Sequence, residues 1–149
     1  MKTVLRIIKS NHFMSIATSY QNDTWITPIY YIFDNKYLYF VSSIHSKHVQ
    51  HIQLNKKVAV SIFDSSQTDN INGIQMKGEV VEIPISEYSK ILELYFYINE
   101  TINEKISEKI SEYKKNKRAI FQVKPIEIYI QDVEYFKKYH IDRRIKVTL

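Results

Sequence analysis

Short apolar and β-branched runs, separated by polar turns, recur along most of this chain and predict a protein built mainly from β-strands. The predicted strands cover residues 13–18, 25–33, 37–43, 58–63, 74–83, 119–123 and 127–131. The polar segment Asp34-Asn35-Lys36 has favourable turn chemistry, so residues 25–43 are predicted to form a hairpin. Pro28 has no backbone N–H to donate, which indicates a bulge or a sheet edge at that position.

Residues 25–33 differ from the other predicted strands because they are apolar on both faces. One face carries Trp25 and Ile29, and the other carries Ile26 and Pro28. A strand of this kind is usually buried on both sides, so its second face needs a cover from a ligand or another subunit. The chain is also rich in aromatic residues, with 12 Tyr and 7 Phe. We therefore expect a homodimer that buries part of this aromatic surface between its subunits.

A helical period replaces the strand pattern in other parts of the chain. Residues 3–9 and 46–54 are each predicted to form a short helix. The inner face of the second helix is predicted to carry Val49, Ile52 and Leu54.

Two further helices are predicted between residues 84 and 118, where apolar residues form two stripes. The stripes consist of Tyr88, Ile91, Leu92, Tyr95 and Phe96, and of Ile102, Ile106, Ile110 and Tyr113. Thr101 and Glu104 have the spacing of a capping box for the second helix. These stripes are expected to pack beside the sheet and to present an apolar wall, which would suit a flat or greasy substrate.

Composition and charge narrow the function classes. The 149 residues suffice for one domain with its own core, and the absence of Cys excludes disulfides, thiol nucleophiles and thiolate metal sites. No apolar stretch approaches the roughly 20 residues of a membrane span, and no signal peptide is recognisable, so a cytoplasmic location is expected. The net charge of +5 permits nucleic-acid binding, but the basic residues are scattered. Their densest cluster, 114–118, is interpreted as a solvated helix end.

The strongest chemical signal is the turn between the predicted strand 37–43 and the predicted helix 46–54. This turn contains Ser42, Ser43, Ser46, Lys47 and His48. Hydroxyls, cationic side chains and a helix N-terminus at one place suit a phosphate monoester. Taken alone, the segment is explained equally well by a helix cap at Ser46 with exposed Lys47 and His48.

The order of strand, hydroxyl-rich turn, short helix and strand, placed after residues 25–34, resembles the FMN-binding split-barrel proteins of the pyridoxamine 5'-phosphate oxidase-like superfamily. Ser46-Lys47-His48 is similar to the Ser and two basic residues that bind the FMN phosphate in that family. Asn55-Lys56-Lys57-Val58 resembles its Asn-Pro-x-Val start of a strand, with Lys in place of Pro. Thr27-Pro28-Ile29-Tyr30 matches the strand along the flavin ring. The resemblance covers residues 10–83 well, is weaker over 119–132 and is absent over 84–118.

The resemblance implies a single domain, 1–149, that is mainly β with flanking helices. Its expected architecture is a six-stranded antiparallel split β-barrel with peripheral helices and a helical insert at about 84–118. It further implies FMN bound at the interface of a homodimer. The residues it assigns to the cofactor are Pro28, Ile29, Tyr30, Ser42, Ser43, Ser46, Lys47, His48 and Gln75. For Gln75 the alternative remains an outward-facing polar residue on an alternating strand.

The resemblance also implies a flavin-dependent oxidoreductase acting on an unidentified small molecule. Residues 141–146, with Arg143 and Arg144, do not match the closing motif of true pyridoxamine 5'-phosphate oxidases, so that particular activity is not expected. The alternatives are a non-enzymatic flavin or heme storage protein on the same fold, and a nucleic-acid binder. The choice among FMN, a deazaflavin and heme stays open at this point.

Other chemistry finds little support in the sequence. His45, His48 and His51 are spaced by three, but the first and last diverge by about 240° around a helix, and no carboxylate lies beside them. No metal site is therefore predicted. The carboxylates form no evident acid–base pair, and no Ser-His-Asp order with a Gly-rich elbow is present, so no catalytic residue is assigned.

Overall fold

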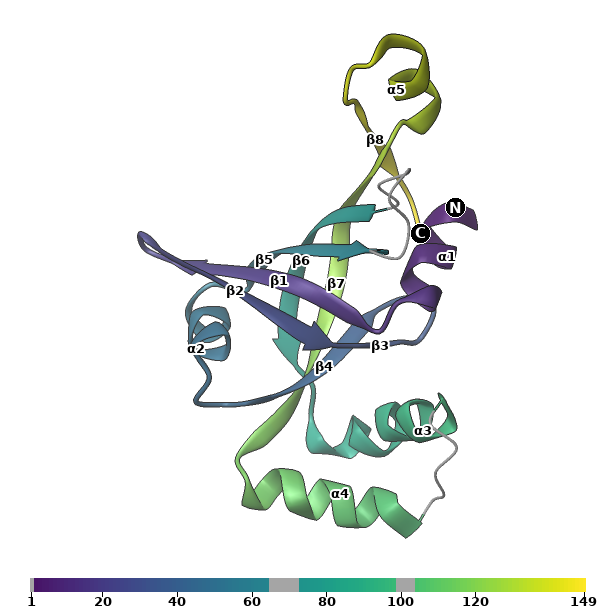
Figure 1. Ribbon diagram of the computed structural model, residues 1–149. Coiled ribbons are helices and arrows are strands. Elements are labelled where there is room, and N and C mark those ends of the chain that lie inside the picture. Colours follow the sequence, from purple (N-terminus) through teal and green to yellow (C-terminus); the bar gives the residue numbers. More distant parts are fainter. Residues whose placement is uncertain (1, 65–72, 99–103) are drawn as a thin grey trace.

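The computed structural model describes residues 2–64, 73–98 and 104–149, which form a strongly curled antiparallel sheet with helices around it (Figure 1). The strands are β1 (Phe13–Tyr20), β2 (Asp23–Tyr30), β3 (Ile32–Phe33), β4 (Leu38–Ser43), β5 (Lys57–Phe63), β6 (Gly73–Glu82), β7 (Arg118–Gln131) and β8 (Arg144–Val147). The helices are α1 (Lys2–Ser10), α2 (Lys47–Leu54), the short 3-10 turn η1 (Ile85–Glu87), α3 (Tyr88–Ile98), α4 (Glu104–Lys115) and α5 (Val133–Tyr139).

The two ends of the sheet are joined through a single residue. The strand order is β2-β1-β5-β6-β7-β4-β3, and β8 adds to β7. The first and last strands of this order, β2 and β3, are consecutive in the chain and are separated only by Tyr31. The Tyr31 N–H donates to the His12 carbonyl at 3.0 Å, and its hydroxyl donates to the Ile8 carbonyl at 2.7 Å. The sheet therefore curls back on itself, and the mainly β, split-barrel expectation is confirmed, with eight strands in place of six.

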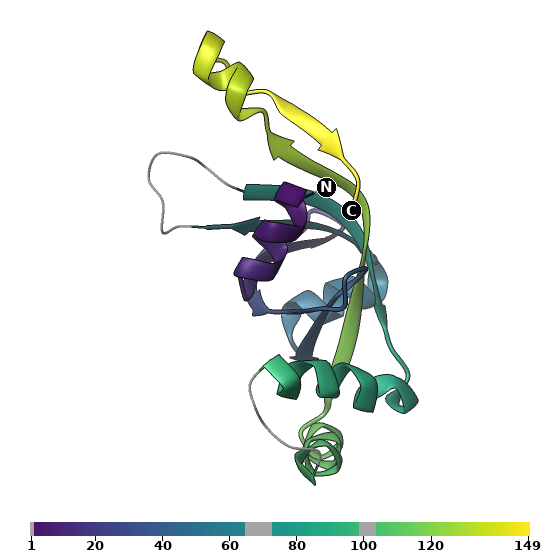
Figure 2. The ribbon, with the colours of Figure 1, turned by 90° about the vertical axis from the view of Figure 1, so that its right-hand side faces the viewer.

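Apolar side chains pack on both sides of the barrel wall. Along β4, Phe40 points into the barrel core, whereas Tyr39 packs in a second cluster with α3 and α4. Along β7, Phe121 and Ile120 divide in the same way. The predicted stripe on α3 is buried in this second cluster, and Figure 2 shows α3 and α4 lying below the barrel as a separate layer. The helices of the 84–118 segment thus cover the outer face of the sheet. The proposed capping box at Thr101 lies outside the described residues.

The predicted hairpin over residues 25–43 is wrong for most of its length. Residues 23–30 pair instead with β1, from Tyr20↔Asp23 to Phe13↔Tyr30, and only β3 pairs with β4. Pro28 does lie on a sheet edge, because β2 ends the strand order. The strand is not buried on both faces within one chain, since Trp25 is 45% and Ile26 is 65% exposed.

Three further details depart from the sequence expectations. Residues 118–131 form one strand, and its register with β6 shifts at Lys77/Gly78, so the break expected around Lys124-Pro125 is a bulge. A side chain at Gly78 would lie 3.0 Å from Val123 Cγ1, so the strands approach closely here. Leu54 is exposed and not inward-facing. The elements α5 and β8 were not predicted from the sequence.

Within the described ranges, no helix is long and apolar enough to cross a bilayer.

Candidate functional site

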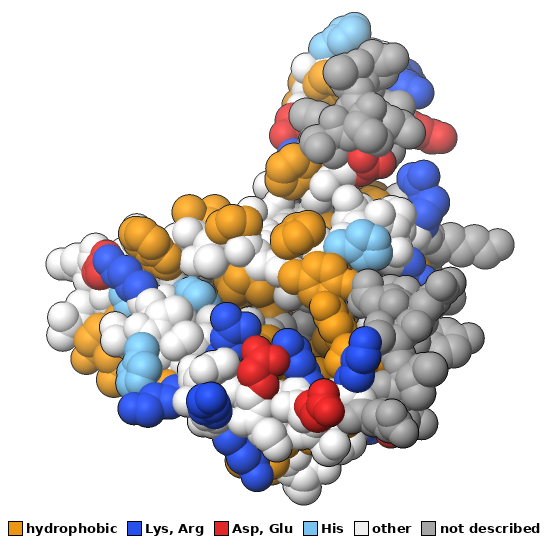
Figure 3. Space-filling model, turned by 60° about the horizontal axis from the view of Figure 1, so that its bottom comes forward, with side chains coloured by type: hydrophobic (Ala, Val, Ile, Leu, Met, Phe, Trp, Pro, Cys, Tyr) orange, Lys and Arg blue, Asp and Glu red, His pale blue; other side chains and the backbone are white. Residues whose placement is uncertain are grey.

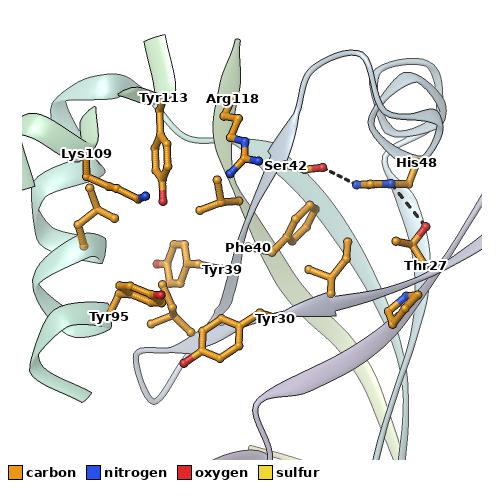
Figure 4. Close-up of a pocket in the computed structure, with 15 residues that line it drawn as sticks. Thr27, Tyr30, Tyr39, Phe40, Ser42, His48, Tyr95, Lys109, Tyr113 and Arg118 are labelled. Atoms are coloured by element: carbon orange, nitrogen blue, oxygen red, sulfur yellow. Dashed lines mark hydrogen bonds between the residues drawn. The ribbon is translucent and has the colours of Figure 1, made fainter. Parts of the chain in front are cut away.

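A pocket with a volume of about 430 Å³ lies where the edge of the barrel meets the α3–α4 layer (Figure 4). This volume falls within the roughly 300–1,000 Å³ typical of small-molecule sites. The lining residues come from β2, β3, β4, α2, α3, α4 and the first residue of β7. They are Thr27, Pro28, Ile29, Tyr30, Ile32, Tyr39, Phe40, Val41, Ser42, His48, Leu92, Tyr95, Lys109, Tyr113 and Arg118.

On the barrel side, hydroxyl groups hold the imidazole of His48 in a fixed position. Ser42 stands near the end of β4 and His48 in the first turn of α2, so the tight turn between these elements brings them together. The Ser42 Oγ lies 2.7 Å from His48 Nε2, and the Ser46 Oγ lies 3.2 Å from the same nitrogen. The Thr27 Oγ1 lies 3.5 Å from Nδ1. A ligand at this side of the pocket therefore meets a preorganised set of hydrogen-bonding groups.

The imidazole of His48 is nearly fully buried, and burial lowers its pKa from the ordinary value of 6.5. The ring is therefore neutral at pH 7 and carries one N–H. The Ser46 residue occupies the N-cap position of α2, but its hydroxyl donates to the Ser43 carbonyl at 2.8 Å and makes no capping bond. The first turn of α2 thus keeps backbone N–H groups that no side chain caps at this end of the pocket.

The opposite wall carries aromatic hydroxyls and cations. Tyr95 comes from α3, Lys109 and Tyr113 come from α4, and Arg118 begins β7. Burial raises the pKa of the Tyr113 hydroxyl to about 12. The Lys109 Nζ lies 2.6 Å from Glu112 Oε2 and 5.6 Å from the centroid of the Tyr113 ring. The expected apolar wall is present in part: Leu92, Tyr95 and Tyr113 of the predicted stripes reach the pocket, and Lys109 adds a cation beside them.

Arg118 stands between these two sides. Its backbone pairs with Ser43 of β4, which sets it beside the turn that holds Ser42 and His48. Within the described part of the chain, no ion pair engages its guanidinium, which lies between Tyr113 and Ser42 in the view of Figure 4. Figure 3 shows Lys and Arg side chains gathered over the α3–α4 end of the molecule. The pocket is therefore suited to an anionic ligand with a flat, apolar part.

The comparison with known families decides the affiliation of the chain. The family model described as pyridoxamine 5'-phosphate oxidase matches residues 1–132. The chain belongs to this family. It is also similar to the UPF0306 protein plu4501 of Photorhabdus laumondii, at 30% identity over 81 residues. That match covers 52% of this chain and 57% of the relative, so the chain spans little more than half the length of the curated relatives it matches.

Solved structures of low sequence identity share the fold of this oxidase-family chain. An FAD-binding protein of Mesorhizobium loti has a TM-score of 0.62 at 15% identity, covering 84% of this chain and 87% of that protein. The heme storage protein HutZ of Vibrio cholerae has a TM-score of 0.66 at 10% identity, with coverages of 87% and 92%. An F420 reductase has a TM-score of 0.55 at 20% identity, with coverages of 78% and 87%.

The structure brings together about half of the residues that the sequence assigned to a cofactor. Five of them line the pocket of this oxidase-family member: Pro28, Ile29, Tyr30, Ser42 and His48. Ser46 lies directly behind, with its Oγ 3.1 Å from Ser42 Oγ. Ser43 stays at the turn, where its Oγ accepts from the His45 N–H at 3.2 Å.

Two assigned residues lie elsewhere. Lys47 turns away from the pocket, with its Nζ 2.8 Å from Asp23 Oδ2 and 4.9 Å from the centroid of the Trp25 ring. Gln75 is exposed on β6, where it pairs with Ser61 and Tyr129, beside a separate surface hollow. His51 has surroundings different from those of His48. Its Nδ1 lies 3.3 Å from Thr18 Oγ1, and its Nε2 lies 3.3 Å from Asp23 Oδ2.

The pocket residues of the oxidase-family chain that the sequence did not assign to a cofactor include Tyr95, Lys109, Tyr113 and Arg118. Tyr95 and Tyr113 were placed on apolar stripes, which correctly put them on an inner face but did not reveal that this face reaches a pocket. Lys109 precedes Tyr113 by about one helical turn, and this spacing indicates that the two side chains share one face of the helix. Arg118 belongs to the cluster that was interpreted as a solvated helix end, and its pairing with Ser43 depends on long-range sheet register.

Proposed function

We propose that this member of the pyridoxamine 5'-phosphate oxidase family binds FMN in the pocket and acts as a flavin-dependent oxidoreductase on a small molecule. The observation that carries the proposal is the combination of Ser42, His48 and Arg118 at one part of a pocket whose remaining walls are mostly aromatic and aliphatic. A phosphate monoester attached to a flat heterocycle has the same distribution of polar and apolar parts.

The side chains present fit this cofactor. The hydroxyl of Ser42 and the guanidinium of Arg118 would hold the phosphate, and His48 would orient the Ser42 hydroxyl through its Nε2. The backbone of Pro28, Ile29 and Tyr30 would flank the ring system. When bound, FMN supplies the redox chemistry, while the protein supplies binding, orientation and exclusion of water. The neutral state of His48 leaves Arg118 as the principal charge for the phosphate.

Two of the fold relatives point to other cofactors that the experiment must distinguish. One relative is an F420 reductase and another is a heme storage protein. Heme requires a free axial ligand, whereas both ring nitrogens of His48 lie within 3.5 Å of hydroxyl groups. This arrangement favours a flavin-type ligand. A non-enzymatic flavin or heme storage role is the alternative to catalysis, and an absorption spectrum of the purified protein separates flavin from heme.

A homodimer is part of the same proposal. One face of the β1–β2 pair leaves large apolar side chains in solvent: Phe13 is 64% and Ile26 is 65% exposed, and the strand register puts both on the same side. Exposed apolar patches of this kind mark interaction surfaces. A second copy would cover β2, the strand that also lines the pocket. A cytoplasmic location, expected from the sequence, completes the proposal and is tested by cell fractionation.

The decisive experiment compares FMN with riboflavin, which lacks the phosphate. Flavin fluorescence quenching is titrated with wild type, with Arg118→Ala and with the matched control Lys115→Ala, which removes an exposed cation that does not line the pocket. A charge-assisted hydrogen bond is worth about 1.5–3 kcal/mol. We expect Arg118→Ala to weaken FMN by about tenfold or more and riboflavin by less than about twofold. Equal losses for both ligands, or no flavin binding by wild type, would contradict the proposal.

A further inference from the structure

We propose that the α4 side of the pocket is a substrate subsite in which Tyr113 and Lys109 bind the carboxylate of a planar, singly charged anion. This inference rests on the proposed function, because it takes the barrel side of the pocket as the flavin side. It assigns the opposite wall to the molecule that the flavin would oxidise or reduce.

The first observation is an unused hydrogen-bond donor. The Tyr113 side chain is only 5% exposed, and within the described residues its hydroxyl has no hydrogen-bond partner. Figure 4 shows this hydroxyl pointing into the pocket. Because burial raises its pKa to about 12, the group keeps its proton at neutral pH and can donate. A donor that faces a pocket in this way can form a hydrogen bond with an acceptor on a ligand.

The second observation is the sign of the charge around this donor. The residues that line the pocket include Lys109 and Arg118 but no Asp or Glu among the described ones. Arg118 is already assigned to the flavin phosphate. The remaining cation, Lys109, is partly neutralised by Glu112, whose Oε2 lies 2.6 Å from its Nζ. One partly neutralised cation and one neutral donor suit a carboxylate better than a doubly charged phosphate.

The third observation is the shape of the walls. Tyr95 stands edge-on to Tyr30 of β2, with ring centroids 5.7 Å apart, so the helix layer and the barrel are linked by aromatic contact. Tyr39 also lines the pocket and lies near Tyr95 and Tyr30 in the view of Figure 4. Aromatic faces on several sides favour a flat ligand. In the same view, Tyr113 and Lys109 lie on the side opposite Ser42 and His48, which separates the subsite from the phosphate-binding group.

The experiment measures binding by calorimetry to the FMN-loaded protein, with naphthalene-2-carboxylate and naphthalene-2-carboxamide as probes of equal shape. We expect the carboxylate to bind about tenfold more tightly than the amide. Tyr113→Phe should weaken the carboxylate by about threefold or more. Lys109→Met should abolish the preference for carboxylate over amide, whereas the matched control Glu112→Gln, which breaks the same ion pair but keeps the cation, should preserve it.

Each contrary result has a defined meaning. If the two probes bind equally, or neither binds, the subsite is refuted. If Tyr113→Phe or Lys109→Met weakens FMN but not riboflavin, these residues belong to the phosphate site, and the inference fails while the proposed function stands. If pyridoxamine 5'-phosphate binds more tightly than the carboxylate, the preference for a single charge is refuted. If wild type binds no flavin, the proposed function fails, and the same titrations on the flavin-free protein still decide the subsite.

Discussion

The substitution Lys47→Ala separates the site suggested by local sequence from the site that the structure assembles. The sequence motif assigned Lys47 to a phosphate, whereas the structure pairs its Nζ with Asp23 at 2.8 Å and sets it above Trp25. The Lys47 ammonium, hydrogen-bonded to Asp23, holds the pKa of this carboxyl below its ordinary value, so the carboxylate stays ionised throughout the neutral pH range. We therefore expect Lys47 to make no contact with the FMN phosphate.

The size of the expected effect follows from the geometry. A cation that donates to a phosphate contributes about 1.5–3 kcal/mol, which corresponds to about 10- to 150-fold in Kd. Lys47 does not line the pocket, so its removal should change the FMN Kd by less than about twofold, an effect of weak long-range attraction. The change should instead appear in the fluorescence of Trp25, because the cation above its ring is lost.

The assay is fluorescence titration with FMN and riboflavin at two salt concentrations, and Asp23→Asn is the companion variant. Asp23→Asn removes the carboxylate while leaving Lys47 in place, so an ammonium able to reach the phosphate would be released and would strengthen FMN binding. A tenfold loss of FMN affinity in Lys47→Ala with riboflavin unchanged, or a selective gain in Asp23→Asn, would refute the assignment of the phosphate to Arg118 without Lys47.

Three other outcomes are expected. Because burial lowers the pKa of His48, the unfolded chain binds more protons below about pH 6.5, so the melting temperature should fall as the pH drops through that value, and His48→Gln should flatten this dependence; an identical slope in both proteins would contradict the burial of a neutral imidazole. Sedimentation at micromolar concentration should give about twice 17.8 kDa, and Ile26→Glu on the exposed β2 face should shift it toward monomer; a wild-type monomer would speak against the dimer. Turnover of pyridoxamine 5'-phosphate by FMN-loaded protein should stay below a kcat/KM of about 10⁴ M⁻¹s⁻¹, and a higher value would redirect attention to Arg143 and Arg144.

Most of the helices and strands could be predicted from local sequence patterns. The turn after β4 and the helix α2 were predicted because Ser46 precedes a run with inward Val49 and Ile52, and these side chains are buried. The α3 stripe was predicted for the same reason, since a helical period of apolar residues is visible in sequence. Family resemblance then supplied the curl of the sheet, which alternation alone does not specify.

The missing parts of the site depend on contacts between distant segments. Arg118 reaches the pocket because β7 pairs with β4 in a register that places it opposite Ser43. Lys47 is drawn away by Asp23, which the pairing of β1 with β2 brings to the same end of the molecule. Neither strand pairing can be recognised from the sequence around Arg118 or Lys47. The same limit explains the hairpin error, because the edge-to-edge closure at Tyr31 divides one apolar run into two strands.

The closure at Tyr31 makes one side of the pocket inextensible. Neighbouring Cα atoms stay about 3.8 Å apart, so the adjoining ends of β2 and β3 cannot separate at this point. The two hydrogen bonds from Tyr31 to the carbonyls of His12 and Ile8 hold this junction against the segment that precedes β1. The α3–α4 layer is held to the sheet by side-chain contacts: the Tyr88 hydroxyl accepts from the Ile120 N–H at 3.1 Å, and Tyr95 stands edge-on to Tyr30. We therefore expect the α3–α4 wall of the pocket to shift when ligands of different width bind, while the strand wall keeps its position.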